Sequence, residues 1–357
     1  MIESHRIGAF IPQTFHLLNR YSSSARTLIL FGTYKVSNQY WFRIIKGSGL
    51  PIYGWWVKYL YSWNKYLPSA KKYIQEYGSY TESFHAATTT GDFRQLIDSD
   101  LRHKTLGESW LKSFGWTHNE PLVCLIVRDD NYLNLNLSVS GVKNWDYHSY
   151  RNSDINTYID AVRWLIGQGY WVIRMGRNMK HPTNFVHDKF IDYSFLKNQA
   201  DWLDIWLFST AHFTISTGVG PDIVTPLCSI PILYVNALPI NQAASFFNSI
   251  WVPKKLYWNN GKPLAIIDYV NMSYSHSDEY ASNNIKIVDL NSSEILDYVQ
   301  EFVDIKINEF KLSEIEVNAQ LDFWQRFYSC EKYSQYSHLK HPKAFISPNW
   351  LEKNQSD

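Results

Sequence analysis

The fold class is decided between residues 149 and 231, where two runs stand out: Tyr170-Trp-Val-Ile-Arg-Met-Gly176 and Phe213-Thr-Ile-Ser-Thr-Gly-Val-Gly-Pro-Asp222. Each starts as a short apolar run that leads to glycine, which is typical of a buried strand that ends at a crevice. Helices are expected over 155–166, where apolar residues recur at helical spacing, and around 201–211. Helices that alternate with short buried strands predict an open parallel α/β sheet.

The turn after the second strand is a candidate ligand contact. Thr217-Gly-Val-Gly-Pro-Asp222 contains two glycines, which remove side chains, and a proline that suits the first turn of a helix. Such a turn leaves backbone N–H groups pointing outward and can hold an anion. Ligands of open α/β sheets sit outside the carboxyl ends of the strands. The expected rim is formed by Arg174, Gly176, Thr217 and Gly218.

Upstream, the strongest predicted strand is Pro121-Leu-Val-Cys-Leu-Ile-Val127, which stops abruptly at Arg128-Asp-Asp130. A guanidinium at the carboxyl end of a central strand offers a rigid fork of donors to a phosphate. A structural Arg–Asp pair that holds two domains together is the alternative. Arg151 and Asn152 stand just before the first predicted helix, whose cap is expected at 153–154.

Charge and cysteine content restrict the class of protein. Lys plus Arg number 34 against 33 Asp plus Glu, so no nucleic-acid partner is expected and any anion site must be local. The three cysteines are far apart, which argues against disulfides or a zinc cluster and favours a reducing cytoplasm. The start of the chain lacks the layout of a signal peptide, and no apolar run approaches the roughly 20 residues of a spanning helix, so a soluble protein is expected.

Aromatic residues make up 17% of the chain, and they offer flat faces on which sugar rings stack, or else fill cores. Residues 34–80 are both aromatic and basic. This stretch has two interpretations: a peripheral contact with a membrane surface, or helices packed on a sheet.

Asp98-Ser-Asp100 matches the DxD pattern that grips a divalent cation in metal-dependent sugar transferases. Its apolar neighbours have helical spacing, which favours a solvated helix face instead. The polar break at 117–121 is the best domain boundary, so we expect an N-terminal α/β domain over 1–118 and a C-terminal α/β domain over 119–357. The last helix can pack back on the N-terminal domain.

Taken together, these landmarks resemble a family of bacterial glycosyltransferases from O-antigen, capsule and related surface-polysaccharide gene clusters. The resemblance covers most of residues 119–351 and a thin part of the first domain. The matching segments are Arg6-Ile-Gly8, Val123-Cys-Leu-Ile-Val-Arg-Asp129, Arg151-Asn152, Gly169-Tyr-Trp-Val-Ile-Arg-Met-Gly176, Ile191-Asp-Tyr193, Asp204-Ile205, Ser216-Thr-Gly218, Pro231-Ile-Leu233 and Ile346-Ser-Pro-Asn-Trp-Leu351.

The resemblance implies the two-domain GT-B arrangement, with an acceptor-side domain 1–118, a donor-binding domain 119–357 and a cleft between them. It also implies transfer of a sugar from a nucleotide sugar to a hydroxyl of a glycan or polyprenol-linked acceptor. No metal and no cofactor are expected, because basic side chains and helix N-termini stabilise the departing diphosphate in this fold. The expected location is the cytoplasm, with peripheral contact to the inner face of the membrane as one interpretation.

The site residues follow from these expectations. Arg128 and Asp129 are the catalytic candidates, with Asp130 and His5 as further candidates for a general base. The donor-binding candidates are Arg151, Asn152, Arg174, Gly176, Asp192, Ser216, Thr217 and Gly218, and the acceptor-side candidates are His5, Arg6 and Gly8.

The chain departs from the family pattern at two places. The family's Thr-Ser-Ser-Gly turn is here Thr217-Gly-Val-Gly220, and Ala9 stands where members often have histidine. Two other functions remain open. The first is a nucleotide-sugar epimerase, which would need no acceptor. The second is a non-catalytic scaffold that binds glycans through its aromatic residues.

Overall fold

The computed structural model describes residues 4–21, 29–30, 36–48, 52–53, 59, 62–63, 66, 85, 87, 92–118, 120–129, 131, 146–240, 243, 245–272, 274–330 and 333–354. The chain forms two compact units. Unit 1 comprises residues 1–107, 200–209 and 220–229, and unit 2 comprises 108–199, 210–219 and 230–357. The units are therefore not continuous segments, whereas the predicted domains 1–118 and 119–357 are, and that division stays a prediction.

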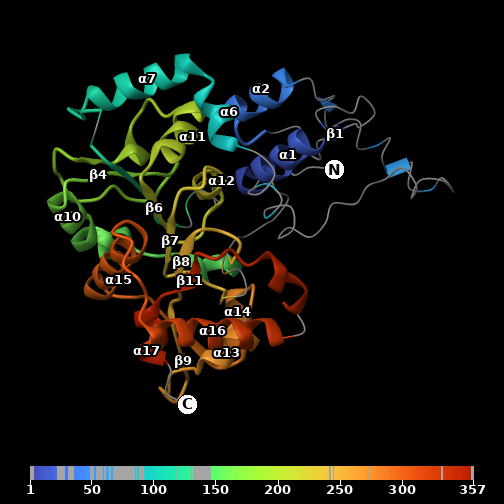
Figure 1. The fold of residues 1–357 in the computed structure, drawn as a ribbon, viewed down its shortest axis with the longest axis vertical. Helices are drawn as coiled ribbons and strands as arrows, with labels where there is room; N and C mark the ends of the chain where they lie inside the picture. The colour runs from blue at the N-terminus through green and yellow to red at the C-terminus, as the bar shows by residue number, and fades with distance from the viewer. Residues whose placement is uncertain are drawn as a thin grey trace. The chain divides into compact units, whose positions relative to one another are not determined.

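A parallel sheet forms the centre of unit 2 (Figure 1). Its strands are β3 Leu122–Ile126, β4 Trp171–Arg174, β5 Phe190–Ile191, β6 Phe213–Ser216, β7 Ile232–Val235, β8 Ser249–Val252 and β11 Ala344–Ile346. They lie in the order β11-β8-β7-β6-β3-β4-β5, and every neighbouring pair is parallel. Strands β3, β4, β6, β7 and β8 are buried along their whole length, which explains their continuous apolar runs. The predicted parallel α/β sheet is confirmed.

The direction in which strands are added reverses between β3 and β6. From β3 the chain moves outward to β4 and β5, and it then returns to the other side of β3 for β6. Cys124 of β3 accordingly pairs with Ile173 on one side and with Thr214 on the other. This order is Rossmann-like, and in such sheets ligands bind at the carboxyl ends of the two strands where the order reverses.

Helices cover the sheet of unit 2. Helix α10 (Ile159–Gly167) packs beside α15 (Ser292–Lys306), and they contact β4 and β7 respectively. Two 3₁₀ helices, η1 (Asp146–Arg151) and η2 (Ile155–Tyr158), precede α10. The carboxylate of Asp154 accepts a hydrogen bond from Asn156 N at 2.9 Å, so the predicted cap is confirmed at the start of η2.

The remaining elements of unit 2 follow β8. An antiparallel pair is formed by β9 (Lys255–Trp258) and β10 (Ile285–Val288). The helices are α13 Ile266–Asn271, α14 Ser277–Ser282, α16 Glu314–Ser329 and α17 Pro348–Asn354, with 3₁₀ helices η3 Tyr193–Phe195 and η6 Ser334–Leu339. Figure 1 shows α13, α16 and β9 together near the C-terminus.

Unit 1 is helical in most of its described part, with one short parallel pair of strands. It contains α1 Ile7–Tyr21, β1 Ile29–Leu30, α2 Gln39–Gly47, β2 Ile52–Tyr53, α6 Phe93–Asp98, the first half of α7 Leu101–Lys112, nearly all of α11 Asp201–Thr210, η4 Gly220–Ile223 and α12 Val224–Leu227. Its core is aromatic: the rings of Phe15 and Trp41 each lie 5.0 Å from that of Phe93, and all three are buried.

The aromatic and basic stretch 34–80 lies largely outside the described residues. In its described part, α2 buries Tyr40 and Trp41, and the side chain of Asn38 caps the helix by accepting a hydrogen bond from Trp41 N. This agrees with the packing interpretation for α2 alone. No helix among the described residues combines the length and apolar character needed to cross a bilayer.

The helix that follows the turn at 217–222 is short. The chain forms the 3₁₀ helix η4 and then only four α-helical residues in α12. Pro226 lies within α12, and a proline there removes one N–H and clashes with the preceding turn. A long helix dipole therefore does not point at this turn, and any anion contact must come from side chains and turn amides.

Candidate functional site

A group of six residues, three of them cationic, lies where the strand order of unit 2 reverses. We call it the β3–β6 cluster, and its members are Arg128, Arg151, Asn152, Thr217, Gly218 and Lys254. These residues follow the carboxyl ends of β3, β6 and β8 or end η1. Arg128 and Lys254 are 126 positions apart in the sequence (254 − 128), and the parallel sheet brings the members together at one edge.

Thr217 joins the two central strand ends. Its Oγ1 accepts a hydrogen bond from Arg128 N at 2.9 Å, and its own N–H donates to Ile126 O at 3.2 Å. The residue is only 1% exposed. The hydroxyl therefore fixes the backbone at which Arg128 leaves the sheet, which is a structural use of the side chain that we expected to contact a ligand.

Two hydrogen bonds connect Arg128 to the segment after η1. Arg128 Nε donates to Asn152 Oδ1 at 3.3 Å, and Ser153 N donates to Arg128 O at 3.0 Å. Asn152 therefore orients the guanidinium through its amide oxygen. The structural Arg–Asp pair that the sequence allowed for Arg128 stays a prediction.

Arg151 reaches across the glycine turn. One Nη donates to Gly218 O, and the buried Nε has no hydrogen-bond partner among the described residues. Gly218 adopts φ +78°, a conformation that glycine adopts without strain, and its N–H donates to Ser216 Oγ at 2.9 Å. A buried N–H that lacks a partner costs free energy, so Arg151 retains hydrogen-bonding capacity for a bound anion.

Lys254 is the functional candidate that sequence reasoning missed. Its side chain is 3% exposed, and Nζ lies 2.7 Å from Asp289 Oδ1 and donates to Asn152 O. Ser153 Oγ donates to the other Asp289 oxygen at 2.8 Å. Burial lowers the pKa of Lys254, and the nearby Asp289 carboxylate opposes that shift. A signal was present in Pro253-Lys-Lys255, two lysines that come directly after β8.

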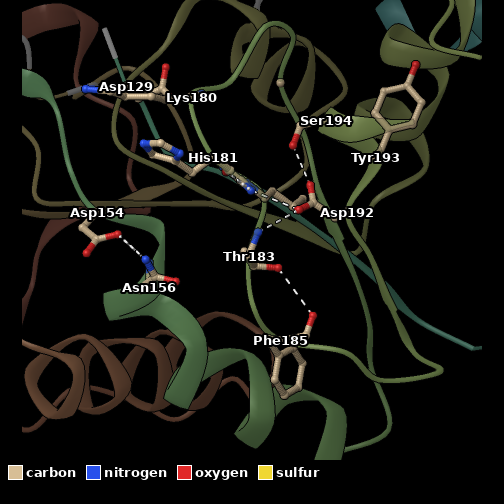
Figure 2. Close-up of polar contacts among 12 residues, drawn as sticks. Asp129, Asp154, Asn156, Lys180, His181, Thr183, Phe185, Asp192, Tyr193 and Ser194 are labelled. Carbon is tan, nitrogen blue, oxygen red and sulfur yellow. Dashed lines mark hydrogen bonds and ion pairs between the residues drawn. The ribbon is translucent and has the colours of Figure 1, made fainter. Parts of the chain in front are cut away.

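Arg174 and Asp192 form a second cluster at the ends of β4 and β5. Arg174 is 2% exposed, and its Nη1 lies 3.0 Å from Asp192 Oδ2 and donates to His181 O at 3.0 Å. Figure 2 shows Asp192 between Thr183 N and Ser194 Oγ, which both donate to its carboxylate. These contacts fasten the loop between β4 and β5. Arg174 Nε is buried and has no hydrogen-bond partner in the described part of the chain, so a ligand role for Arg174 stays a prediction.

Asp129 contacts the loop between β4 and β5, and Gly176 lies in that loop. The carboxylate of Asp129 accepts hydrogen bonds from Lys180 N at 2.8 Å and from Asn131 N at 3.1 Å, and Figure 2 shows it beside Lys180. Gly176 adopts φ +133°, and its carbonyl accepts from Gln199 Nε2 at 2.8 Å. Asp130, the neighbouring candidate for a general base, lies outside the described residues.

The acceptor-side candidates lie in unit 1. His5, Arg6 and Gly8 stand at the start of α1, where Arg6 O accepts from Ala9 N at 3.0 Å. A Cβ on Gly8 would lie 2.8 Å from Gly220 Cα, so glycine is needed for α1 to approach η4. Asp204 also lies in unit 1, within α11.

The DxD segment follows the helical interpretation. Asp98 ends α6, and Asp100 accepts hydrogen bonds from Tyr40 OH at 3.2 Å and from His103 N at 3.2 Å. Its Oδ2 lies 2.6 Å from His103 Nδ1. Asp100 thus caps α7, and the two carboxylates have separate surroundings.

The β3–β6 cluster contains two guanidinium groups and one buried ammonium group, and the ammonium group is paired with the Asp289 carboxylate. Chemically, such a group of fixed donors can neutralise a multiply charged oxyanion. Among the described residues, no three histidine, cysteine or carboxylate side chains gather in a way that could hold a metal ion. Comparisons with protein-family models, curated proteins and solved structures found no match to this chain.

Proposed function

We propose that this protein is a glycosyltransferase that binds the diphosphate of a nucleotide-sugar donor at the β3–β6 cluster. The observation that carries the proposal is the convergence of Arg128, Arg151 and Lys254 where the strand order of a Rossmann-like sheet reverses. This is the position at which open α/β sheets bind ligands. A diphosphate is the kind of ligand that a local excess of positive charge favours. The excess is local, because the whole chain has a formal net charge of only +1.

In the proposed reaction, an acceptor hydroxyl oxygen forms a bond to the anomeric carbon of the donor sugar, and the bond from that carbon to the diphosphate oxygen breaks. Negative charge accumulates on the departing diphosphate. We assign this charge to Arg128 and Arg151, whose Nε has no hydrogen-bond partner among the described residues, with the buried Lys254 beside Asn152. The hydroxyl proton passes to a general base, for which Asp129 remains the candidate.

The two-domain GT-B arrangement is part of this proposal. Unit 2 would bind the donor, and unit 1 would face the acceptor through the segment that contains His5, Arg6 and Gly8. The acceptor would be a hydroxyl of a surface glycan or of a lipid-linked precursor. The resemblance described above supports these assignments, together with the parallel pair β1–β2 in unit 1.

One sequence feature separates this proposal from a nucleotide-sugar epimerase that uses a dinucleotide cofactor. A Rossmann sheet that binds a dinucleotide carries a G-x-G-x-x-G turn after its first strand, because the backbone must approach the pyrophosphate. Here β3 is followed by Arg128-Asp-Asp130, which contains no glycine. A side-chain contact to a diphosphate is therefore favoured over a backbone cradle for a cofactor.

The test begins with a thermal-shift panel of UDP, GDP, CMP and dTDP sugars. A specific donor at 100 times its Kd should stabilise the protein by about 2.7 kcal/mol, since it binds only the folded state. The preferred donor is then incubated with and without a panel of glycan acceptors, and the products are identified by mass spectrometry. Transfer that depends on acceptor supports the proposal. Isomerised donor without acceptor, or no stabilisation by any nucleotide sugar, would refute it.

A further inference from the structure

A concave region of unit 2 is built from elements that the β3–β6 cluster does not use. It lies along α16, between the end of α15 and the segment 340–345, and its volume is about 1080 Å³. We call it the α16 groove. Figure 1 shows α16 as the long helix near the bottom of the view, beside α13. Pockets of about 300–1,000 Å³ commonly bind small molecules, so the groove is large enough for one.

The wall formed by α16 is apolar. Val317, Leu321, Trp324 and Tyr328 line the groove and recur at helical spacing, so they form one stripe. Leu321 is 63% exposed and Val317 is 42% exposed, and Phe310 at the edge of the groove is 61% exposed. Exposed apolar side chains that gather in one place are typical of a binding surface.

The same groove contains four lysines, namely Lys306, Lys311, Lys340 and Lys343. None of them forms an ion pair with a described residue, whereas Lys254 and Lys255 elsewhere in unit 2 are paired with carboxylates. The lining includes one carboxylate, that of Glu309. The lining therefore has an excess of positive charge, which favours an anion.

The lining of the groove also contains a half-buried lysine and a buried indole N–H. Lys306 Nζ donates to Lys343 O and lies 4.2 Å from the centre of the Phe345 ring. Burial, together with the charges of Lys343 and Lys340, lowers the pKa of Lys306 to about 7. Trp324 is 5% exposed, and its Nε1 has no hydrogen-bond partner among the described residues. Both residues would gain from an anionic group at the base of the groove.

We propose that the α16 groove binds one molecule of an anionic amphiphile. Its phosphate or carboxylate head would lie among Lys306, Lys340 and Lys343, and its hydrocarbon chain would lie along Val317 and Leu321. A single molecule fits better than a bilayer surface, because Trp324 is buried and Lys306 is half-buried, and a flat surface would not reach the Trp324 indole. The α16 groove and the β3–β6 cluster share no residue.

The test is isothermal titration of the full chain with decyl phosphate below its critical micelle concentration. We expect one molecule to bind per chain, and inorganic phosphate to bind at least about tenfold more weakly because it lacks the chain. Decyltrimethylammonium, which has the opposite charge, should not bind. Equal binding of that cation, or binding of many molecules per chain, would overturn the proposal, as would absence of binding.

Variants separate the two halves of the site. Lys340→Gln/Lys343→Gln should weaken decyl phosphate by about tenfold, because the head loses two cations. The matched control Lys262→Gln/Lys286→Gln removes two exposed lysines elsewhere in unit 2 and should leave affinity unchanged. Leu321→Gln, at an exposed position that folding does not require, should weaken decyl phosphate but not inorganic phosphate.

Vesicles identify the source of the ligand. If the chain sediments with phosphatidylglycerol vesicles but does not bind monomeric decyl phosphate, the surface is a membrane contact and the proposal is wrong. If monomer binds and the double lysine variant does not, the groove is a site for a single amphiphile. Either result leaves the nucleotide-sugar panel unaffected, so failure here is distinct from failure of the proposed function.

Discussion

Arg151→Gln is the sharpest test of the β3–β6 cluster. The substitution removes the positive charge of Arg151 and its hydrogen bond to Gly218 O. It also removes the buried Nε, which has no hydrogen-bond partner among the described residues. Hydrogen bonds to charged groups contribute about 1.5–3 kcal/mol. Because about 1.4 kcal/mol corresponds to tenfold in Kd, donor affinity should fall by roughly 10- to 100-fold.

The assay is titration calorimetry with the nucleoside diphosphate that the thermal-shift panel selects. Arg163→Gln is the matched control, since Arg163 is 64% exposed on α10 and forms a surface pair with Asp160. Such a pair contributes about 0–1 kcal/mol to stability, and its loss should leave donor affinity unchanged. Arg151→Lys should give an intermediate affinity, because it keeps the charge and loses the planar fork.

Stability of each variant is measured by urea unfolding, so that loss of binding is not confused with loss of the fold. If Arg151→Gln binds the diphosphate as tightly as the parent protein while Arg163→Gln does the same, the cluster does not bind the donor. If both variants lose affinity equally, the attraction is a general effect of charge, and the assignment of Arg151 is again refuted.

Three other predictions concern stability. Burial raises the pKa of Glu301 to about 7 from an ordinary 4.5, so the folded state keeps a proton that the unfolded state loses, and stability should fall by at most about 3 kcal/mol as pH rises from about 4.5 through 7. Glu301→Gln should flatten that dependence in urea unfolding at pH 5 and pH 8, and an unchanged slope would contradict the burial argument. Gly218→Ala should cost about 1 kcal/mol in thermal unfolding, since φ is +78° while the nearest atom to a new Cβ, Arg151 Nη2, is 3.7 Å away. Gly218→Asn should cost less, because asparagine tolerates this conformation, and equal costs would indicate a steric cause instead. Arg174→Met should destabilise unit 2 by about 3–5 kcal/mol, because it leaves the Asp192 carboxylate, 19% exposed, without its cation. Recovery in Arg174→Met/Asp192→Asn would confirm the pair, and a parent-like melting temperature for the single variant would refute it.

Local elements of unit 2 could be predicted from the sequence. The apolar runs at 121–127, 170–176 and 213–216 became β3, β4 and β6, and the cap at Asp154 was recognisable from its side chain alone. Short buried strands and helix caps depend on residues that are adjacent in the chain. The alternation of helices and strands also predicted the parallel sheet, since parallel neighbours require a crossover connection.

Contacts between distant segments could not be predicted in this way. Lys254 joins the β3–β6 cluster only because β8 lies two strands from β6, and the order of strands is a property of the whole sheet. Arg174 and Asp192, which we had assigned to a donor, are paired with each other because neighbouring strands end side by side.

Sequence by itself therefore determined the elements of this protein, their apolar faces and the fold class, because these follow from the spacing of residues along the chain. Only the tertiary structure decided which charges meet, which are already paired, and where the α16 groove gathers four lysines beside one carboxylate. The physical reason is that burial and ion pairing depend on distances through space, which strand order and helix packing set after the local elements have formed.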